Sequence, residues 1–295
     1  MWCSDVDLHS HSTHSDGTLD VATLAANMAR EGVRVWSLTD HDTTSGWEEA
    51  AVEAERHGMA FLPGVELTCM PALVPSSDAK REGSWHLLAY FPGPLDAPKM
   101  RDVRAWISGL TEARGPRMSL MIERLASFGI DVDESNVLAR ADGAVGRPHL
   151  AAELLDMGVV DTFQQAFDDW IGDGAPANVE RPRPTLEEAS AHVHAAGGFC
   201  SLAHPVYYGV DTADVLDLLC ELGIEAVEAF HGGHTDAYRD EVWRAAVERG
   251  LSVTAGSDHH GPEHHPRPGH RPVPIADVPE AVRHLREHAR TTGQS

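Results

Sequence analysis

Histidine and carboxylate side chains cluster close to the start of this chain, in the segment Asp-Leu-His9-Ser-His11. Residues two apart on a strand point to the same side, so a strand here would direct His9 and His11 toward one point. The turn-forming segment Ser15-Asp16-Gly17 follows and adds a carboxylate. Imidazole and carboxylate ligands without thiolate suit Zn, Mn or Fe better than Ca or an iron–sulfur cluster. The segment therefore offers candidate ligands for such a metal.

The same residue types recur at the ends of other predicted strands. One such histidine alone is more often a surface residue or a hydrogen-bonded core residue, and it is the repetition that favours a metal centre. In barrels of parallel strands, functional residues gather at the carboxyl ends of the strands. His86 fits this rule poorly, because it opens its apolar run. The recurring residues are His41 in LTDHDT, Glu66 in GVELT, His86 in WHLLAYF, His204 in AHP, and Asp258 and His260 in GSDHH.

The composition narrows the possible partners. The 295 residues include 19 histidines, and 46 acidic against 23 basic residues give a formal net charge of −23. This charge argues against a large nucleic-acid surface, but a small anionic substrate could still be held by metal cations. No apolar run approaches the roughly 18 residues of a membrane span, and the first ten residues do not resemble a signal peptide. We therefore expect a cytoplasmic protein without a membrane partner. The four cysteines form no CxxC pair.

Apolar runs alternate with helical patterns along most of the chain, and glycines such as Gly223 and Gly250 stand where a helix should end. Such alternation is typical of an α/β protein with a parallel sheet covered by helices. Seven candidate strands favour a closed or nearly closed barrel, with an open doubly wound sheet as the alternative. The candidate strands are 5–9, 33–38, 59–67, 85–91, 199–203, 224–230 and 251–256.

Residues 98–184 interrupt this alternation, because they contain several helical patterns and no convincing strand. We predict a helical insertion there that contributes to substrate binding. The barrel that carries the metal site would then consist of residues 1–97 and 185–295. Within the insertion, Arg147 and His149 of the segment GRPH are the candidate substrate-binding residues, because arginine offers a planar fork of donors to phosphate.

The motifs DLHSHSTHSDG, LTDHDT, GVELT, AHP and GSDHH, taken in order, resemble those of the PHP (polymerase and histidinol phosphatase) family. HLLAYF and GRPHLA extend the resemblance over nearly the whole chain. Within the family, the chain is most similar to the 3′,5′-nucleoside bisphosphate phosphatases, which carry a helical insertion and also trim short RNA from its 5′ end. The resemblance implies a distorted seven-stranded TIM-like barrel and three divalent metal ions, taken to be Mn, Fe or Zn.

The resemblance also assigns the metal ligands and the catalytic residues. Glu66, Asp258 and His204 would be catalytic through their bound metals, by attack of a metal-bridging hydroxide on phosphorus. The leaving-group acid is not assigned: His234 is a candidate, but a surface histidine is the favoured interpretation of that position. The first metal would take His9, His11, Glu66 and Asp258, the second Glu66, His86 and His204, and the third Asp16, His41 and His260.

The chain departs from its relatives after the FDxxIG-like segment, where they carry a basic and an aromatic residue. Here Asn178 stands near the aromatic position, and Arg181 or Arg183 could replace the missing contacts. We therefore expect a metal-dependent phosphatase acting on the 3′-phosphate of nucleoside 3′,5′-bisphosphates, with 5′-to-3′ cleavage of short oligonucleotides as a second activity. The alternatives are a histidinol-phosphatase-type enzyme, a metal-dependent C–N hydrolase and a non-enzymatic metal-binding module. The sequence makes no prediction about the oligomeric state.

Overall fold

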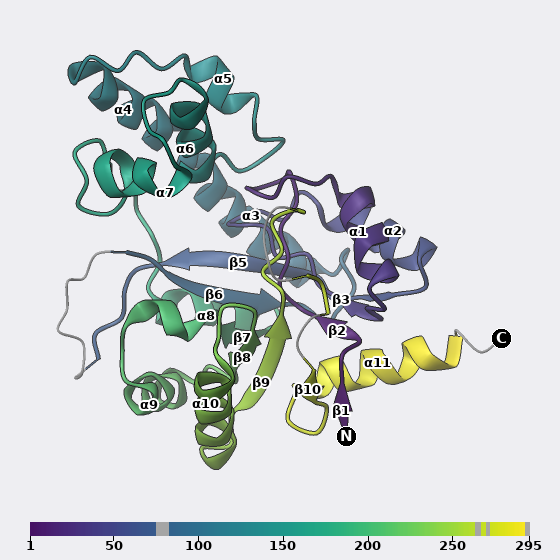
Figure 1. Cartoon of the computed structure of the whole chain (residues 1–295). Coiled ribbons are helices and arrows are strands. Elements are labelled where there is room, and N and C mark those ends of the chain that lie inside the picture. Colours follow the sequence, from purple (N-terminus) through teal and green to yellow (C-terminus); the bar gives the residue numbers. More distant parts are fainter. Residues whose placement is uncertain (75–82, 263–266, 270–271, 293–295) are drawn as a thin grey trace.

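The computed structural model describes residues 1–74, 83–262, 267–269 and 272–292. Every predicted apolar run contains a strand, and the run 59–67 contains two, so the chain is an α/β protein as predicted (Figure 1). The strands are β1 (Trp2–Cys3), β2 (Val6–Asp7), β3 (Val35–Trp36), β4 (Ala60–Phe61), β5 (Gly64–Cys69), β6 (Trp85–Tyr90), β7 (Phe199–Leu202), β8 (Ala226–His231), β9 (Ser252–Gly256) and β10 (Val273–Pro274).

Two sheets carry the central strands. β2, β3 and β4 form a parallel sheet, and β5 to β9 pair in chain order in a second sheet. Backbone hydrogen bonds connect the two sheets at two places, from Leu8 N to Ala255 O (2.9 Å) and from Glu66 N to Thr39 O (3.0 Å). Strands β1 and β10 form a small separate antiparallel pair. The main hydrophobic core lies around these strands and includes Val65, Leu87 and Val227.

The direction of β6 differs from the parallel arrangement that we expected. β6 is antiparallel to both β5 and β7, whereas β7, β8 and β9 run parallel to one another. The sequence between β5 and β6 contains Pro71, Pro75 and Gly83 rather than a helical pattern, whereas a parallel pair needs a crossover connection, which is usually a helix. Reversal places the first residues of β6 beside the last residues of β5, with His86 opposite Thr68.

Helices cover the sheets as the alternation predicted. Gly223 and Gly250 end helices with φ angles of 67° and 76°, a left-handed conformation that glycine adopts without a steric cost. No helix in the described part of the chain is both long enough and apolar enough to cross a membrane. The helices are α1 (Val21–Arg30), α2 (Trp47–Arg56), α8 (Leu186–Ala195), α9 (Thr212–Leu222), α10 (Asp236–Glu248) and α11 (Glu280–Thr292).

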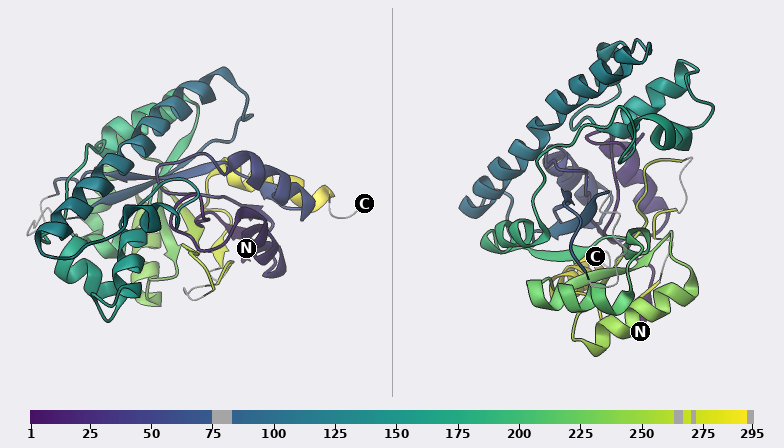
Figure 2. Two further views of the ribbon diagram at one scale, coloured as in Figure 1. Left: turned by 90° about the horizontal axis from the view of Figure 1, so that it is seen from above. Right: turned by 90° about the vertical axis from the view of Figure 1, so that its left-hand side faces the viewer.

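A cluster of helices lies between β6 and β7 in the sequence and at one end of the molecule (Figure 1). Its own hydrophobic core includes Met121, Leu150 and Ile171, whereas Met100 and Ile107 of its first helix belong to the main core. The first two helices of the segment form a long arm that extends from the main core into the core of the cluster (Figure 2). The helices are α3 (Pro98–Glu112), α4 (Arg114–Ser127), α5 (Glu134–Leu138), α6 (Arg147–Asp156) and α7 (Phe163–Ala166), followed by a π-helical turn, Phe167–Ile171.

Backbone hydrogen bonds fix this cluster to the rim of the sheets. Asp142 N donates to Thr13 O (2.9 Å), and Ala144 N donates to His14 O (2.7 Å). Thr13 and His14 belong to the loop that carries the first predicted ligands. The helical segment is therefore held directly beside the candidate metal centre.

Candidate metal centre and adjoining cavity

The structure brings all nine predicted ligands together at one end of the strands. His9 and His11 follow β2, and His41 follows β3. Glu66 lies within β5, and the reversed direction of β6 places His86 at the same rim. His204 follows β7, Asp258 and His260 follow β9, and Asp16 lies in the turn after β2.

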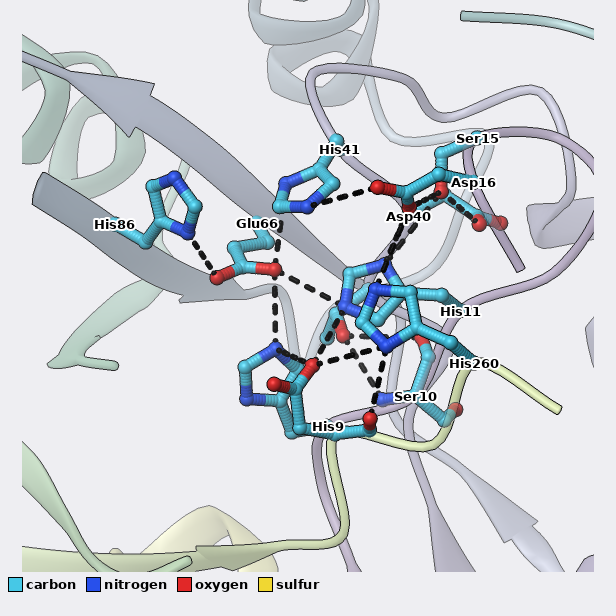
Figure 3. Close-up of polar contacts among 12 residues, drawn as sticks. His9, Ser10, His11, Ser15, Asp16, Asp40, His41, Glu66, His86 and His260 are labelled. Carbon is cyan, nitrogen blue, oxygen red and sulfur yellow. Dashed lines mark hydrogen bonds and ion pairs between the residues drawn. The ribbon is translucent and has the colours of Figure 1, made fainter. Parts of the chain in front are cut away.

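Glu66 lies at the centre of the group, and Figure 3 shows His9, His11, His41 and His86 around its carboxylate. The side chain of Glu66 is buried. Two oxygens on one carboxylate can serve two cations at once, so this arrangement suits a bridging ligand. Oε2 lies 3.0 Å from His9 Nε2, 3.0 Å from His11 Nε2 and 3.3 Å from His41 Nδ1, and Oε1 lies 2.7 Å from His86 Nδ1 and 3.1 Å from His204 Nε2.

Two further carboxylates extend the group on either side. Asp258 Oδ1 lies 3.2 Å from His9 Nε2 and 3.1 Å from His11 Nε2. Asp16 lies 3.6 Å from His41 Nε2 and 3.5 Å from His260 Nε2. The donor atoms come within 4.8 Å of one another in three groups: His9, His11, Glu66 and Asp258; His41, Glu66 and His86; and His11, Asp16, His41 and His260.

The buried ring nitrogens of this group are better placed to bind cations than to form hydrogen bonds with one another. His11 Nε2, His41 Nδ1 and His204 Nδ1 are buried and make no hydrogen bond within the described residues. A Glu66 oxygen lies within 3.3 Å of His11 Nε2 and of His41 Nδ1, but neither nitrogen forms a hydrogen bond with it. Burial disfavours the charged form of His11, but the carboxylates of Asp258 and Glu66 outweigh burial and raise its pKa to about 10. The carboxylates therefore draw positive charge into the site, and divalent ions would satisfy both kinds of ligand.

A buried glutamate that was not predicted from the sequence contacts two of the predicted ligands. Glu228 Oε1 lies 3.0 Å from His9 Nδ1, and Glu228 Oε2 accepts a hydrogen bond from His204 N (2.9 Å). A carboxylate on the second ring nitrogen fixes the orientation of a metal-binding histidine. A Cβ atom on Gly256 would lie 2.2 Å from His9 Cβ and 2.6 Å from Glu228 Oε1, so only glycine lets β9 pass this pair.

Two histidines after β8 have different surroundings. His231 Nδ1 accepts a hydrogen bond from Gly233 N (3.0 Å), which leaves Nε2 to donate to Asp258 Oδ2 (3.3 Å). The expectation of a surface position for His234 was wrong, since its side chain is buried and its Nδ1 donates to Ala229 O (2.9 Å). Burial lowers the pKa of His234 to about 4. His234 is therefore neutral near pH 7, and its one ring proton lies on Nδ1 and is donated to Ala229 O.

Unusual backbone conformations mark the rim. Among the described residues, the non-glycine residues with positive φ are Asp42, His204 and Asp258, at 51°, 25° and 53°. Such conformations cost free energy and persist where the surrounding structure enforces them, often at functional sites. Two of the three are predicted ligands, and the third anchors the cavity described next.

A cavity of about 200 Å³ adjoins the centre on the side of His41 and His86. Asp16 also borders it. A pocket with several guanidinium groups suits a phosphate dianion, because each group offers paired donors and a permanent positive charge. The arginines that line the cavity are Arg114, Arg117, Arg147, Arg181 and Arg183.

Asp42 positions two of these arginines. Its buried Oδ2 lies 2.6 Å from Arg114 Nη2 and also accepts a hydrogen bond from Arg181 Nη2, while Oδ1 accepts a hydrogen bond from Thr68 N (2.7 Å). Burial alone would raise the pKa of Asp42, but Arg114 and Arg181 outweigh burial and hold this pKa well below its usual range. Asp42 is therefore ionised at neutral pH.

Polar groups of the helical segment and of the residues before β6 hold the remaining arginines. Arg147 Nη1 lies 2.8 Å from Asp173 Oδ1, and Arg117 Nη2 donates to Asn178 Oδ1 (3.0 Å). Asn178 thus orients an arginine. Arg183 donates to Ser84 Oγ (2.8 Å). We refer to the cavity that these five arginines line as the arginine cavity.

The two predicted substrate-binding residues lie on different sides of the helical segment. Arg147 lines the arginine cavity, whereas His149 is buried and borders a second, larger cavity. His149 Nδ1 accepts a hydrogen bond from Gly146 N (3.0 Å) at the start of α6, and burial lowers its pKa. His149 therefore caps the helix that carries Arg147. Arg114 and Arg117 were not predicted from the sequence, because no local motif distinguishes them from other helical arginines.

Comparison with known proteins identifies the family. The PHP domain profile matches residues 7–112. A 5′-3′ exoribonuclease of Haemophilus influenzae is 32% identical over 259 residues, which cover 87% of this chain and 90% of the relative. A 3′,5′-nucleoside bisphosphate phosphatase of Chromobacterium violaceum is 28% identical over 276 residues, covering 88% of each chain. The solved structure of a candidate metal-dependent phosphoesterase from Bifidobacterium adolescentis superposes with a TM-score of 0.78 at 29% identity, covering 95% of this chain and 94% of that one. The chain belongs to the PHP domain family and is a phosphoesterase of that family.

Proposed function

We propose that the protein hydrolyses the 3′-phosphate of nucleoside 3′,5′-bisphosphates. The observation that carries the proposal is the arginine cavity, which opens directly beside His41 and His86 of the candidate metal centre. A substrate with two phosphates could place one at the centre and the other among the arginines. A relative named as a 3′,5′-nucleoside bisphosphate phosphatase supports this choice of substrate.

The same proposal assigns three divalent ions, Mn, Fe or Zn, to the three ligand groups predicted from the sequence. When bound, such ions lower the pKa of a coordinated water and offset the charge of the phosphoryl group. Glu66 would serve two ions, and Glu228 would hold His9 in the orientation that binding requires. We further infer that the two connected sheets form the distorted seven-stranded barrel, with β4 and β5 of the single predicted run 59–67 counted as one strand. Residues 98–184 would be the insertion that supplies substrate contacts.

In this mechanism, residues of the protein position the two phosphates of the substrate. The arginines would grip the non-reacting 5′-phosphate, and Asp42, Asp173 and Asn178 keep their guanidinium groups in place. Binding energy from a remote group can hold the reacting phosphorus where a water attacks in line with the departing 3′-oxygen. Water attack forms one P–O bond while the bond to the 3′-oxygen breaks, and that oxygen takes up a proton.

Initial rates on several substrates test this function. The metal-loaded protein should hydrolyse adenosine 3′,5′-bisphosphate with a much higher kcat/KM than histidinol phosphate, because histidinol phosphate has no second phosphate for the arginine cavity. Adenosine 3′-monophosphate is the matched substrate that lacks the 5′-phosphate, and it should also react slowly. Equal or faster hydrolysis of histidinol phosphate would favour the histidinol-phosphatase alternative. Hydrolysis of an amide or amidine substrate alone would favour a C–N hydrolase.

Replacing Arg147 with alanine should remove most of the preference for the bisphosphate over the 3′-monophosphate. A hydrogen bond to a charged group contributes roughly 1.5–3 kcal/mol, so we expect kcat/KM for the bisphosphate to fall about ten- to a hundredfold. Hydrolysis of a generic aryl phosphate should fall much less. Arg101→Ala is the control, because Arg101 is exposed and outside the lining of the cavity. Equal losses on all substrates would mean that Arg147 acts on the reacting phosphate or on folding.

A further inference from the structure

A cluster of possible metal ligands lies away from the candidate metal centre, at the opposite end of the strands. His194 belongs to the last turn of α8, Cys200 lies at the start of β7, and Glu225 immediately precedes β8. One donor atom from each of the three lies within 4.8 Å of the other two. The other such groups within the described residues all belong to the candidate metal centre. This cluster is therefore a separate feature, which the proposed function does not use.

The thiol of Cys200 makes no hydrogen bond within the described part of the chain, although the residue is fully buried. The buried thiols of Cys3 and Cys69, by contrast, each donate to a backbone carbonyl oxygen 3.6 Å away. The sulfur of Cys200 instead faces the imidazole of His194 and the carboxylate of Glu225. A buried sulfur in these surroundings is placed as a metal ligand would be.

The spacing of the other two donor atoms suits a tetrahedral ion. His194 Nε2 lies 3.0 Å from Glu225 Oε1. Two ligands about 2.0–2.1 Å from Zn²⁺ at the corners of a tetrahedron lie roughly 3.3 Å apart. Glu225 Oε2 accepts a hydrogen bond from Cys200 N (3.0 Å), which holds the carboxylate beside the thiol. Because His194 and Glu225 are exposed, an ion can enter from solvent and water can complete its coordination.

The charges of the three side chains also suit a divalent ion. Burial and the carboxylate of Glu225 raise the pKa of the Cys200 thiol, so the sulfur carries its proton at neutral pH when no cation is nearby. Binding of a divalent ion would form a bond to sulfur and release that proton to water. The thiolate and the carboxylate would then carry two negative charges, which balance the two positive charges of the ion.

We propose that His194, Cys200 and Glu225 bind a Zn²⁺ ion, with water as the fourth ligand. Zn²⁺ accepts sulfur, nitrogen and oxygen ligands together, whereas Ca²⁺ and Mg²⁺ take oxygen ligands. The bound ion would connect the end of α8 to the first residues of β7 and β8. Residues at this end of the strands of such barrels contribute to stability rather than to catalysis. The ion therefore stabilises the fold at the end of the strands remote from the candidate metal centre.

Titration with Co²⁺, a spectroscopic substitute for Zn²⁺, tests the site, because a bond between Co²⁺ and a thiolate gives a charge-transfer absorption band in the near ultraviolet. None of the nine predicted ligands of the candidate metal centre is a cysteine, so ions bound there do not contribute to this band. The wild-type protein should develop the band, and added Zn²⁺ should abolish it. Cys200→Ser should lack the band, whereas Cys220→Ser, which changes an exposed cysteine, should retain it. Absence of the band in the wild-type protein, or its persistence in Cys200→Ser, would overturn the inference.

His194→Ala provides a second test that leaves the buried core intact. It should raise the Co²⁺ concentration that gives half of the band about tenfold or more, since even partners outside the ligand shell contribute ten- to a hundredfold to metal affinity. Zn²⁺ should also raise the Tm of this variant less than that of the wild-type protein. His57→Ala is the control, because it makes the same change at the exposed end of α2. Equal Co²⁺ affinities in the two variants would overturn the inference, and neither readout depends on hydrolysis or on the proposed function.

Discussion

Replacing Glu66 with glutamine should lower kcat for phosphate ester hydrolysis by roughly a hundred- to ten-thousandfold. The estimate follows from the several kcal/mol that a metal ion contributes to the transition state, with each 1.36 kcal/mol corresponding to a factor of ten. Glu66 contacts the imidazoles of five predicted ligands, and its two oxygens face different ligand groups. The neutral amide of glutamine would weaken both groups at once.

Measurement of bound metal should accompany the rates for this variant. We expect Glu66→Gln to retain fewer ions per chain than the wild-type protein after gel filtration. Glu55→Gln is the matched control, because it makes the same change on the exposed face of α2. Wild-type rates and metal content in Glu66→Gln would show that the carboxylate does not bridge the predicted ligand groups.

Replacing Asp42 with asparagine should lower both stability and substrate preference. The change leaves Arg114 and Arg181 without the carboxylate that both contact. Breaking a buried ion pair by removing one partner costs about 3–5 kcal/mol of unfolding free energy. The released arginines would also grip the 5′-phosphate less well, so kcat/KM for the bisphosphate should fall more than kcat/KM for the 3′-monophosphate.

Thermal and denaturant unfolding at pH 7 measure the stability of this variant. The pKa of Asp42 is lowered in the folded protein, so its contribution is present at neutral pH and is lost only as the pH falls below the usual aspartate range. Asp217→Asn is the control, because Asp217 pairs with Arg249 on the exposed surface, where ion pairs contribute about 0–1 kcal/mol. Equal stability losses in the two variants would mean that Asp42 does not anchor the arginines.

The candidate ligands could be picked out from the sequence because one simple rule places them at one rim of the fold. Functional residues follow the carboxyl ends of parallel strands, and short motifs around His9, His41 and Asp258 mark those ends. His86 broke the rule in the sequence, since it opens its apolar run. The antiparallel direction of β6, which the alternation of strands and helices did not reveal, explains its position.

The arginine cavity was predicted only in part, because it depends on contacts between distant segments. Arg147 stood in a recognisable motif, but Arg114 and Arg117 lie on a helix whose placement no local pattern specifies. Glu228 was overlooked because it lies in a strand that is otherwise apolar. Nothing in the sequence near it indicates that it forms hydrogen bonds with His9 and His204. A charged residue within a buried strand was nevertheless a signal, since such a group requires hydrogen bonds.

Hydrolysis of adenosine 3′,5′-bisphosphate by metal-stripped protein, before and after addition of Mn²⁺, shows whether catalysis depends on bound metal ions. Elemental analysis of the same samples gives the number of ions per chain. We expect no detectable hydrolysis by the stripped protein and recovery of activity as ions bind at the His9, Glu66 and Asp258 cluster. Undiminished hydrolysis by protein shown to be free of metal would mean that the cluster is not a catalytic metal centre.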